Sequence, residues 1–274
     1  MKRIHWFEIM DFDWFPSFFR DIITDTIKIS DKNPIFNRIV PVIIKAMEKS
    51  KTNTVVDLCS GGGGPWFQLF HLIKKEKPDF ELKFTDLFPN KKTIDSIPPE
   101  LRENIEYILE PIDATNVPKD LKGIRTFFGS FHHMRPEQAK QILEGVAKDK
   151  VGIVAGEVCM FPRDKAWLLL VFELLFFPFY LLMYWIMAIK AIKGTILTKI
   201  LRFIFIYPIP VIPLVMMWDS AVSAMRVYTK DDLENIIKDI KVDGYVLEAK
   251  EIPPSRNQPA IHYCIGYPVD DNEG

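Results

Sequence analysis

The sequence has few cysteines and almost no excess charge. Its three cysteines, Cys59, Cys159 and Cys264, lie far apart in no metal-like spacing, and the formal net charge of the 274 residues is −1. An odd number of scattered cysteines argues against a disulfide framework or a zinc site and favours a reducing compartment. A nearly neutral chain has no electrostatic footprint for nucleic acid. We therefore predict no metal centre and no nucleic-acid partner.

Two further signals are missing. The first residues reach the acidic Glu8 before any apolar run develops, so the pattern predicts no signal peptide and we expect the chain to stay in the cytoplasm. No Gly-Lys-Ser or Gly-Lys-Thr follows the glycine-rich stretch, which excludes a P-loop. The length allows one large domain or two small ones with an ample core.

A run of four glycines stands out among the features that are present. Three β-formers lead into Asp57, the glycines occupy 61–64, and an apolar helical pattern covers 67–73. A strand that turns into a helix through glycines brings the backbone close to a ligand, and the helix start offers free N–H groups. The stretch predicts the beginning of a βαβ nucleotide site, and the alternative is a tight loop without a ligand.

Strand and helix patterns alternate after this turn. Further strands are expected over 81–86, 105–109, 124–128 and 151–157. Such alternation predicts a parallel sheet covered by helices on both faces. Late in the chain, Thr229 caps a helical pattern, and strands over 245–249 and 261–267 form a closing hairpin.

The glycine stretch resembles the first motif of class I S-adenosylmethionine (SAM)-dependent methyltransferases, acidic-x-Gly-x-Gly-x-Gly. Asp57, Gly61 and Gly63 fit this frame, while Cys59 stands where the first glycine is usual. The closing hairpin resembles the end of the same family's fold, whereas nicotinamide-binding Rossmann domains usually end without such a hairpin. The resemblance covers roughly 50–160 and 220–268. It implies an α/β fold with a doubly wound, mostly parallel seven-stranded sheet, and SAM as the cofactor.

The resemblance also implies which residues bind the cofactor. Asp86 ends the second strand, where a carboxylate can accept both ribose hydroxyls, although it can also simply start the following turn. Asp113 and Ala114 resemble the adenine contact of the family. The predicted cofactor-binding residues are Asp57, Cys59, Ser60, Gly61, Gly63, Asp86, Leu87, Asp113, Ala114, Ser130 and Phe131.

Candidate catalytic residues follow the fourth strand. Methyl transfer to a hydroxyl or carbon needs a positioned nucleophile. It can also need a base whose pKa lies near neutral pH, which favours histidine. His132 and His133 lie in this loop and either can be that base, while packing and ordering of the loop is the alternative for each. The loop lacks the Asn/Asp-Pro-Pro-aromatic motif that resembles amino-group methylation, so we expect O- or C-methylation.

Four residues are candidates for substrate binding. Asp219, Arg226 and Tyr228 arrive where the substrate is expected, and Trp14 belongs to an aromatic-rich N-terminal segment that can cap the main domain or act as a lid. Arg226 can hold a carboxylate or phosphate through its two-pronged donor edge. A salt bridge that anchors the apolar insertion is an equal alternative.

A long apolar insertion separates the fifth strand from the final helix. It contains an apolar run over 166–189, a second run over 203–217 broken by prolines, and four basic residues between them. The first run reaches the length of a membrane span and the second does not. A spanning hairpin would place the basic loop on the far side of the membrane from a cytoplasmic catalytic domain, against the tendency of basic loops to stay on the cytoplasmic side. We therefore favour a hairpin lying in the membrane interface. A dimer interface, an apolar lid and true spanning are the alternatives.

These patterns predict four regions and one function. The regions are a helical cap over 1–50, a SAM-binding core over 51–160, the insertion over 161–218 and the rest of the core over 219–274. The predicted function is a SAM-dependent methyltransferase at the cytoplasmic membrane face, peripherally associated, acting on a lipophilic or amphiphilic small molecule. A homodimer through the insertion is possible. An NAD(P)-dependent oxidoreductase and a non-catalytic, membrane-docked binding protein are the alternatives.

Overall fold

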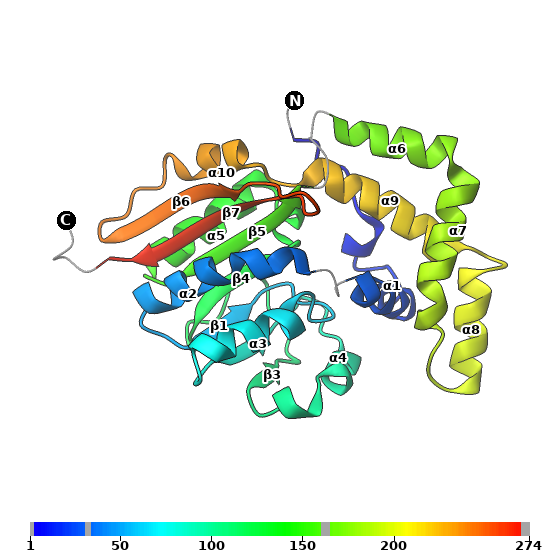
Figure 1. Ribbon diagram of the computed structural model, residues 1–274, viewed down its shortest axis with the longest axis horizontal. Helices are drawn as coiled ribbons and strands as arrows, with labels where there is room; N and C mark the ends of the chain where they lie inside the picture. The colour runs from blue at the N-terminus through cyan, green and yellow to red at the C-terminus, as the bar shows by residue number, and fades with distance from the viewer. Residues whose placement is uncertain (1–2, 31–33, 160–164, 270–274) are drawn as a thin grey trace. The chain divides into compact units, whose positions relative to one another are not determined.

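The computed structural model describes residues 3–30, 34–159 and 165–269 (Figure 1). The chain divides into two compact units. Met1–Lys32 and Met160–Val227 form one, which we call the helical unit. Asn33–Cys159 and Tyr228–Gly274 form the other, which we call the sheet unit.

The sheet unit contains one seven-stranded sheet in the order β3-β2-β1-β4-β5-β7-β6. The first five strands run parallel, and β7 pairs antiparallel with both β5 and β6. The predicted seven-stranded α/β sheet is therefore present, and it is mixed because of its closing antiparallel hairpin. The strands are β1 (Thr54–Asp57), β2 (Glu81–Phe84), β3 (Ile105–Tyr107), β4 (Ile124–Phe128), β5 (Ile153–Cys159), β6 (Tyr245–Ile252) and β7 (Ala260–Pro268).

Helices cover both faces of this sheet, as the alternation of strands and helices predicts. Neighbouring strand residues point to opposite faces, so Val55 belongs to one hydrophobic cluster and Val56 to another. The cluster around Val55 includes α2 (Val40–Lys49) and α3 (Trp66–Glu76), and the cluster around Val56 includes α5 (Pro136–Lys148) and α10 (Lys230–Ile237). The shorter elements of this unit are η2 (Pro34–Ile39), α4 (Lys91–Ser96), η3 (Pro99–Leu101) and η4 (Phe131–His133).

The helical unit joins the N-terminal segment to the apolar insertion. Phe15, Ile22 and Ile23 share one core with Tyr184 and Met216. The predicted boundaries at 50 and 218 therefore differ from the structure, because these aromatic and aliphatic side chains bury one another while η2 and α2 pack in the sheet unit. The helices of the unit are η1 (Ile9–Asp11), α1 (Ser17–Ser30), α6 (Ala166–Leu175), α7 (Phe177–Ala188), η6 (Ile189–Ala191), α8 (Ile196–Ile206) and α9 (Val211–Arg226).

Neither apolar run forms one continuous helix. The run over 166–189 breaks at Phe176, between α6 and α7, and Pro178 lies in the first turn of α7, where proline needs no N–H partner. The run over 203–217 breaks in the proline-containing segment between α8 and α9. Among the described residues no single helix has the length and apolarity to cross a membrane. Within the same described ranges, one helix pair passes that test, α8 with α9, and it is bent by 59°.

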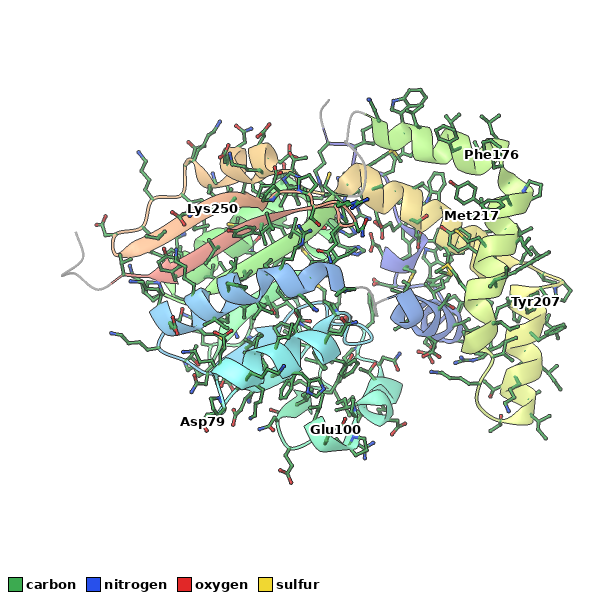
Figure 2. The ribbon with its side chains drawn as sticks, viewed as in Figure 1. Asp79, Glu100, Phe176, Tyr207, Met217 and Lys250 are labelled. Carbon is green, nitrogen blue, oxygen red and sulfur yellow. The ribbon has the colours of Figure 1, made fainter. Side chains whose placement is uncertain are left out.

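Exposure of apolar side chains differs sharply within the helical unit. Met217 is 6% exposed in its core, whereas Phe176 is 53% exposed (Figure 2). Many other large apolar side chains of α6, α7 and α8 resemble Phe176 in this respect. The unit therefore has a proper core and, outside it, an apolar surface.

Candidate cofactor and catalytic site

The candidate site lies at the carboxyl edge of the sheet, where the strand order reverses between β1 and β4. The segments that follow neighbouring strands are bonded to one another there. Ser60 N–H, after β1, donates to Thr85 O, after β2, at 2.9 Å. Ile112 N–H, after β3, donates to Asp86 O at 2.9 Å. The edge is thus a connected frame built from the loops after three parallel strands.

The glycine-rich turn takes left-handed backbone conformations along most of its length. The φ angles of Cys59, Gly61, Gly63 and Gly64 are 58°, 50°, 95° and 46°. A Cβ at Gly61 would meet nothing within 4 Å, so the backbone there lies against open space, whereas a Cβ at Gly63 would come within 3.0 Å of the Phe67 ring. A Cβ at Gly64 would also meet nothing within 4 Å, so Gly61 and Gly64 are the points of the turn at which a ligand can approach the backbone. Cys59, which departs from the family motif, carries a conformation that costs an L-residue about 1–2 kcal/mol.

Asp57 lies beneath this turn. Its side chain is 4% exposed and accepts a hydrogen bond from Thr126 Oγ1 at 2.8 Å. Burial raises the pKa of Asp57 to about 7, the charge of Asp86 adds to this, and hydrogen bonds from Ser60 and Thr126 oppose it. The Asp57 carbonyl also accepts from Ser60 Oγ at 2.8 Å and from Thr85 Oγ1 at 2.9 Å. Asp57 and Ser60 thus hold the shape of the turn.

Asp86 joins the second strand to the glycine turn. Its Oδ2 accepts from Gly61 N–H at 2.7 Å, and its Oδ1 accepts from Phe88 N–H at 2.8 Å. Asp86 thus starts the turn, as one sequence interpretation has it, and its carboxylate also meets Gly61, while its ribose-binding role stays a prediction. The two backbone N–H groups orient the Asp86 carboxylate at the edge of the sheet.

Two residues that the sequence interpretation missed support the same turn. Thr93 Oγ1 donates to Gly61 O at 3.1 Å, and Tyr107 OH donates to the same oxygen at 3.3 Å. Burial raises the pKa of Tyr107 to about 12, which keeps its hydroxyl a donor. Tyr107 ends β3, and its polar group at the ligand edge of the sheet was the available signal.

The remaining predicted cofactor residues lie in different environments. Asp113 is exposed and its Oδ1 accepts from Thr115 N–H at 2.8 Å, forming a local turn, while Ala114 beside it is buried in the core. Leu87 is 47% exposed. Ser130 and Phe131 are both buried.

The two candidate histidines have different settings. His132 is 6% exposed, its N–H donates to Glu157 Oε1 at 2.8 Å, and its Nδ1 lies 3.0 Å from Glu157 Oε2. If Nδ1–H donates to the Glu157 carboxylate, Nε2 is the ring nitrogen left to accept a proton. His133 stacks on His132 with ring centroids 4.5 Å apart. Glu157 was missed, although an acid near the end of an otherwise apolar strand was a usable signal.

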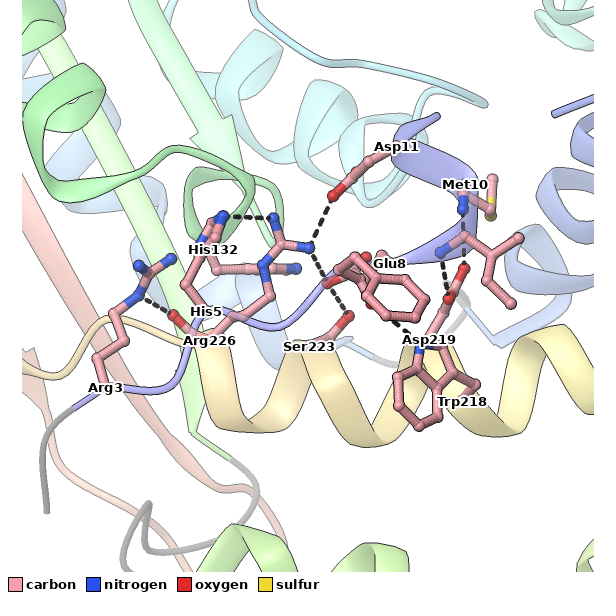
Figure 3. A network of polar contacts seen from close by, with 12 residues as sticks. Arg3, His5, Glu8, Met10, Asp11, His132, Trp218, Asp219, Ser223 and Arg226 are labelled. Atoms are coloured by element: carbon pink, nitrogen blue, oxygen red, sulfur yellow. Dashed lines mark hydrogen bonds and ion pairs between the residues drawn. The ribbon is translucent and has the colours of Figure 1, made fainter. Parts of the chain in front are cut away.

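Arg226 and Asp219 hold the N-terminal segment within the helical unit (Figure 3). Arg226 Nη1 pairs with Glu8 Oε1 at 2.9 Å and with Asp11 Oδ2 at 2.7 Å. Asp219 accepts from Ile9 N–H at 2.7 Å and from Met10 N–H at 3.2 Å. These contacts match the anchoring salt bridge that the sequence left open for Arg226.

The other two substrate candidates are placed differently. Trp14 belongs to the helical unit, is 69% exposed and stacks on Phe12 with centroids 5.4 Å apart. Tyr228 begins the C-terminal part of the sheet unit, where it is 1% exposed, packs on Phe131 and donates to Met134 O at 2.8 Å. Its hydroxyl thus makes a hydrogen bond within the sheet unit.

Comparisons with known proteins give likenesses in fold only. No family model and no curated protein matches the chain. Similar solved structures include the plantazolicin methyltransferase BamL in complex with a triazolic desmethylPZN analogue and SAH, at 12% identity over 92% of this chain and 98% of that one, TM-score 0.45. Human N-acetylserotonin methyltransferase in complex with SAM is 10% identical over 86% of this chain and 53% of that one, TM-score 0.44. A putative Zn-dependent alcohol dehydrogenase from Rhodobacter sphaeroides is 14% identical over 79% and 84%, TM-score 0.44. At these identities and scores, the likenesses assign no activity or substrate to this chain.

Proposed function

We propose that this chain is a SAM-dependent methyltransferase that methylates an oxygen or carbon of a lipophilic or amphiphilic small molecule at the cytoplasmic face of a membrane. One observation carries the cofactor part of the proposal. The Asp86 carboxylate meets Gly61 N–H at 2.7 Å, at the reversal point of the sheet and beside the open space over Gly61. A nucleoside placed there would have a diol acceptor and a bare backbone within reach.

The residues of this edge suit SAM as follows. Gly61 would lie against the cofactor, Asp86 would accept the ribose hydroxyls, and Leu87 would offer its exposed side chain to the adenine ring. The exposed carboxylate of Asp113 would accept from the exocyclic amine of adenine. Asp57 and Tyr107 would act indirectly, because their side chains hold the turn in shape.

The start of α3 argues against the nicotinamide alternative. A dinucleotide site places its pyrophosphate on free N–H groups at the helix start and uses a third small residue for close packing. Here Pro65 has no N–H, Trp66 N–H is bonded to Gly63 O at 3.1 Å, and the Trp66 side chain is fully buried. This helix start therefore suits a nucleoside without a pyrophosphate.

The His132–Glu157 pair favours catalysis over simple binding. The bound cofactor would supply an electrophilic methyl group. With Nδ1–H donated to Glu157, His132 can take up the proton of a substrate hydroxyl at Nε2. A positioned base of this kind contributes about 10²–10⁴-fold to a rate.

Calorimetry tests the cofactor assignment directly. We expect the purified protein to bind SAM and not NAD(H), and we expect Asp86→Ala to weaken SAM binding about tenfold or more, the scale of a lost charged hydrogen-bond pair. Asp120→Ala, which removes an exposed acid elsewhere in the same unit, is the matched control and should leave SAM affinity unchanged. Unchanged affinity in Asp86→Ala, or binding of NAD(H) in place of SAM, would contradict the proposal.

A further inference from the structure

The helical unit has an outer apolar surface formed by α6, α7 and α8. Eighteen of the twenty-four large apolar side chains that are exposed in the described chain fall between Trp167 and Leu214, and fourteen of these lie on α6, α7 or α8. With roughly half of each side chain exposed, they present on the order of 1,500 Å² of apolar area. A typical monomer has a largest apolar patch of about 300–600 Å², so this surface is too large to be incidental.

The exposed residues follow helical spacing, so they form faces and not scattered points. Phe179, Leu182 and Ile186 on α7 are 65%, 50% and 63% exposed, and Ile189, which follows at the start of η6, is 56% exposed; they are spaced by three or four residues. The opposite side of α7 supplies Tyr184 and Ala188 to the core. This helix is therefore apolar both toward the core and toward the outside, as expected of a helix between a protein core and an apolar medium.

The same arrangement recurs on the neighbouring helix α8. Ile196, Ile200 and Phe203 are 80%, 51% and 51% exposed, again one turn apart. Arg202 points the other way and is buried, where its Nη1 pairs with Asp25 Oδ2 at 2.8 Å. The polar anchor of α8 thus faces α1 and leaves an outer face of aliphatic and aromatic side chains.

Basic residues outnumber acidic ones along this segment, since residues 163–202 include six lysines and arginines and two acids, Asp164 and Glu173. The exposed charged side chains described on α6–α8 and their connections are Lys165, Lys193 and Lys199. The buried Asp25 accepts from both Lys193 and Arg202, each at 2.8 Å. Lysines beside an apolar face are the combination that anionic lipid headgroups attract.

We propose that the outer face of α6–α8 docks on an anionic membrane surface, with its apolar side chains among the acyl chains and its lysines at the headgroups. This inference names the surface and the lipid charge for the membrane association included in the proposed function, and it stands without methyl transfer. A second copy of the chain fits less well, because a twofold interface would bring two lysine-bearing faces together. Spanning fits less well too, because α9 carries the buried Asp219 and Arg226 and packs in the core.

Vesicle sedimentation of the full chain, without substrate, tests the proposal. Wild type should sediment with vesicles of equimolar phosphatidylcholine and phosphatidylglycerol, and weakly with phosphatidylcholine alone. The triple variant Phe179→Gln, Leu182→Gln, Ile186→Gln should lose about a hundredfold or more in partitioning, because it removes apolar groups from the outer face without touching the core. The matched control is Ile27→Gln with Leu109→Gln, which changes exposed apolar residues elsewhere and should sediment like wild type.

A charge reversal tests the lipid class separately. Lys199→Glu should reduce sedimentation with the anionic vesicles about tenfold and leave that with phosphatidylcholine unchanged, whereas Lys241→Glu on the sheet unit should change neither. Wild type that stays in the supernatant with both vesicles would overturn the proposal, and so would a triple variant that sediments like wild type. A wild-type dimer that the triple variant converts to a monomer, with no vesicle binding, would assign the surface to self-association. SAM binding measured on the same samples separates these results from a failure of the cofactor assignment.

Discussion

Replacing Arg226 by methionine distinguishes an anchoring role from a substrate-binding role. Methionine keeps the length and the apolar stem of the side chain and removes the guanidinium. In the wild type this group is 2% exposed and lies 2.9 Å from Glu8, which is itself 3% exposed. Ser223 Oγ also donates to Glu8 at 2.9 Å. The substitution would therefore remove the guanidinium that pairs with this buried carboxylate.

The expected cost follows from this geometry. Removing one partner of a buried ion pair destabilises a protein by about 3–5 kcal/mol, because the other charge stays buried without compensation. The second pair, to Asp11, adds up to about 1 kcal/mol, since the Asp11 side chain is 35% exposed. We expect a total loss of about 4 kcal/mol. Adding Glu8→Gln should recover part of it, with a coupling energy of at least about 1.5 kcal/mol in the double-mutant cycle.

Urea unfolding followed by tryptophan fluorescence measures this loss. Two of the six tryptophans, Trp6 and Trp218, stack with centroids 5.9 Å apart, so part of the signal reports the N-terminal segment that Arg226 holds. The control is Lys119→Met, which removes an exposed pair to Asp149 at 3.7 Å and should change stability by less than about 1 kcal/mol. If Arg226→Met unfolds within about 0.5 kcal/mol of wild type, the anchoring argument fails and substrate binding becomes the better account of this residue.

Three further predictions concern the sheet unit. The pKa of Asp57 is raised from 3.8 to about 7 in the folded state, so the folded chain keeps a proton that the unfolded chain releases. The free energy of unfolding should therefore fall by up to about 4 kcal/mol from pH 4 to pH 7. In urea unfolding, Asp57→Asn should lack this part of the pH dependence. Cys59→Val should be less stable than Cys59→Gly by about 1–2 kcal/mol in the same assay, because a β-branched residue resists the left-handed conformation of this position. Burial raises the pKa of Cys264 to about 12, so peptide mapping after alkylation of the native protein near pH 8 should find Cys159 modified and Cys264 intact.

Local patterns were sufficient to predict most of the sheet unit. The expected strand over 151–157 became Ile153–Cys159, and the expected hairpin over 245–249 and 261–267 became Tyr245–Ile252 and Ala260–Pro268. The ends differ because pairing decides them: Ile252 extends β6 since it has Ile261 as its partner on β7. Period-two apolar patterns show that a strand exists, and its neighbours in the sheet determine where it stops.

The site could be predicted in part, for a physical reason. Gly61 and Asp86 follow adjacent parallel strands, so topology alone brings them to one edge, and the structure joins them by a hydrogen bond. The pairing of His132 with Glu157 was not readable in the same way. It depends on the turn of η4 bringing the backbone and ring of His132 onto a side chain of β5, and no local pattern encodes that partner.

The helical unit was the hardest part to foresee, since its core joins segments that are far apart in the chain. Arg226 has its partner at Glu8, and Arg202 has its partner at Asp25, so neither sequence window shows the pair on its own. The apolar composition of the insertion indicated that its side chains are buried in a core, in an interface or in a membrane. It did not indicate that its inner side packs on the N-terminal segment.

This shared core also decides how the membrane proposal should be tested. Deleting 166–217 is the obvious experiment, yet it would remove Tyr184, Val215 and Met216 and leave Phe15 and Ile22 without their partners. Those uncovered side chains would themselves adsorb to vesicles or drive aggregation, so a deletion that still sediments would not show that the surface is irrelevant. Substitutions confined to the exposed turns of α7 keep every buried contact of the unit. Only they separate the apolar area that faces outward from the apolar area that holds the unit together.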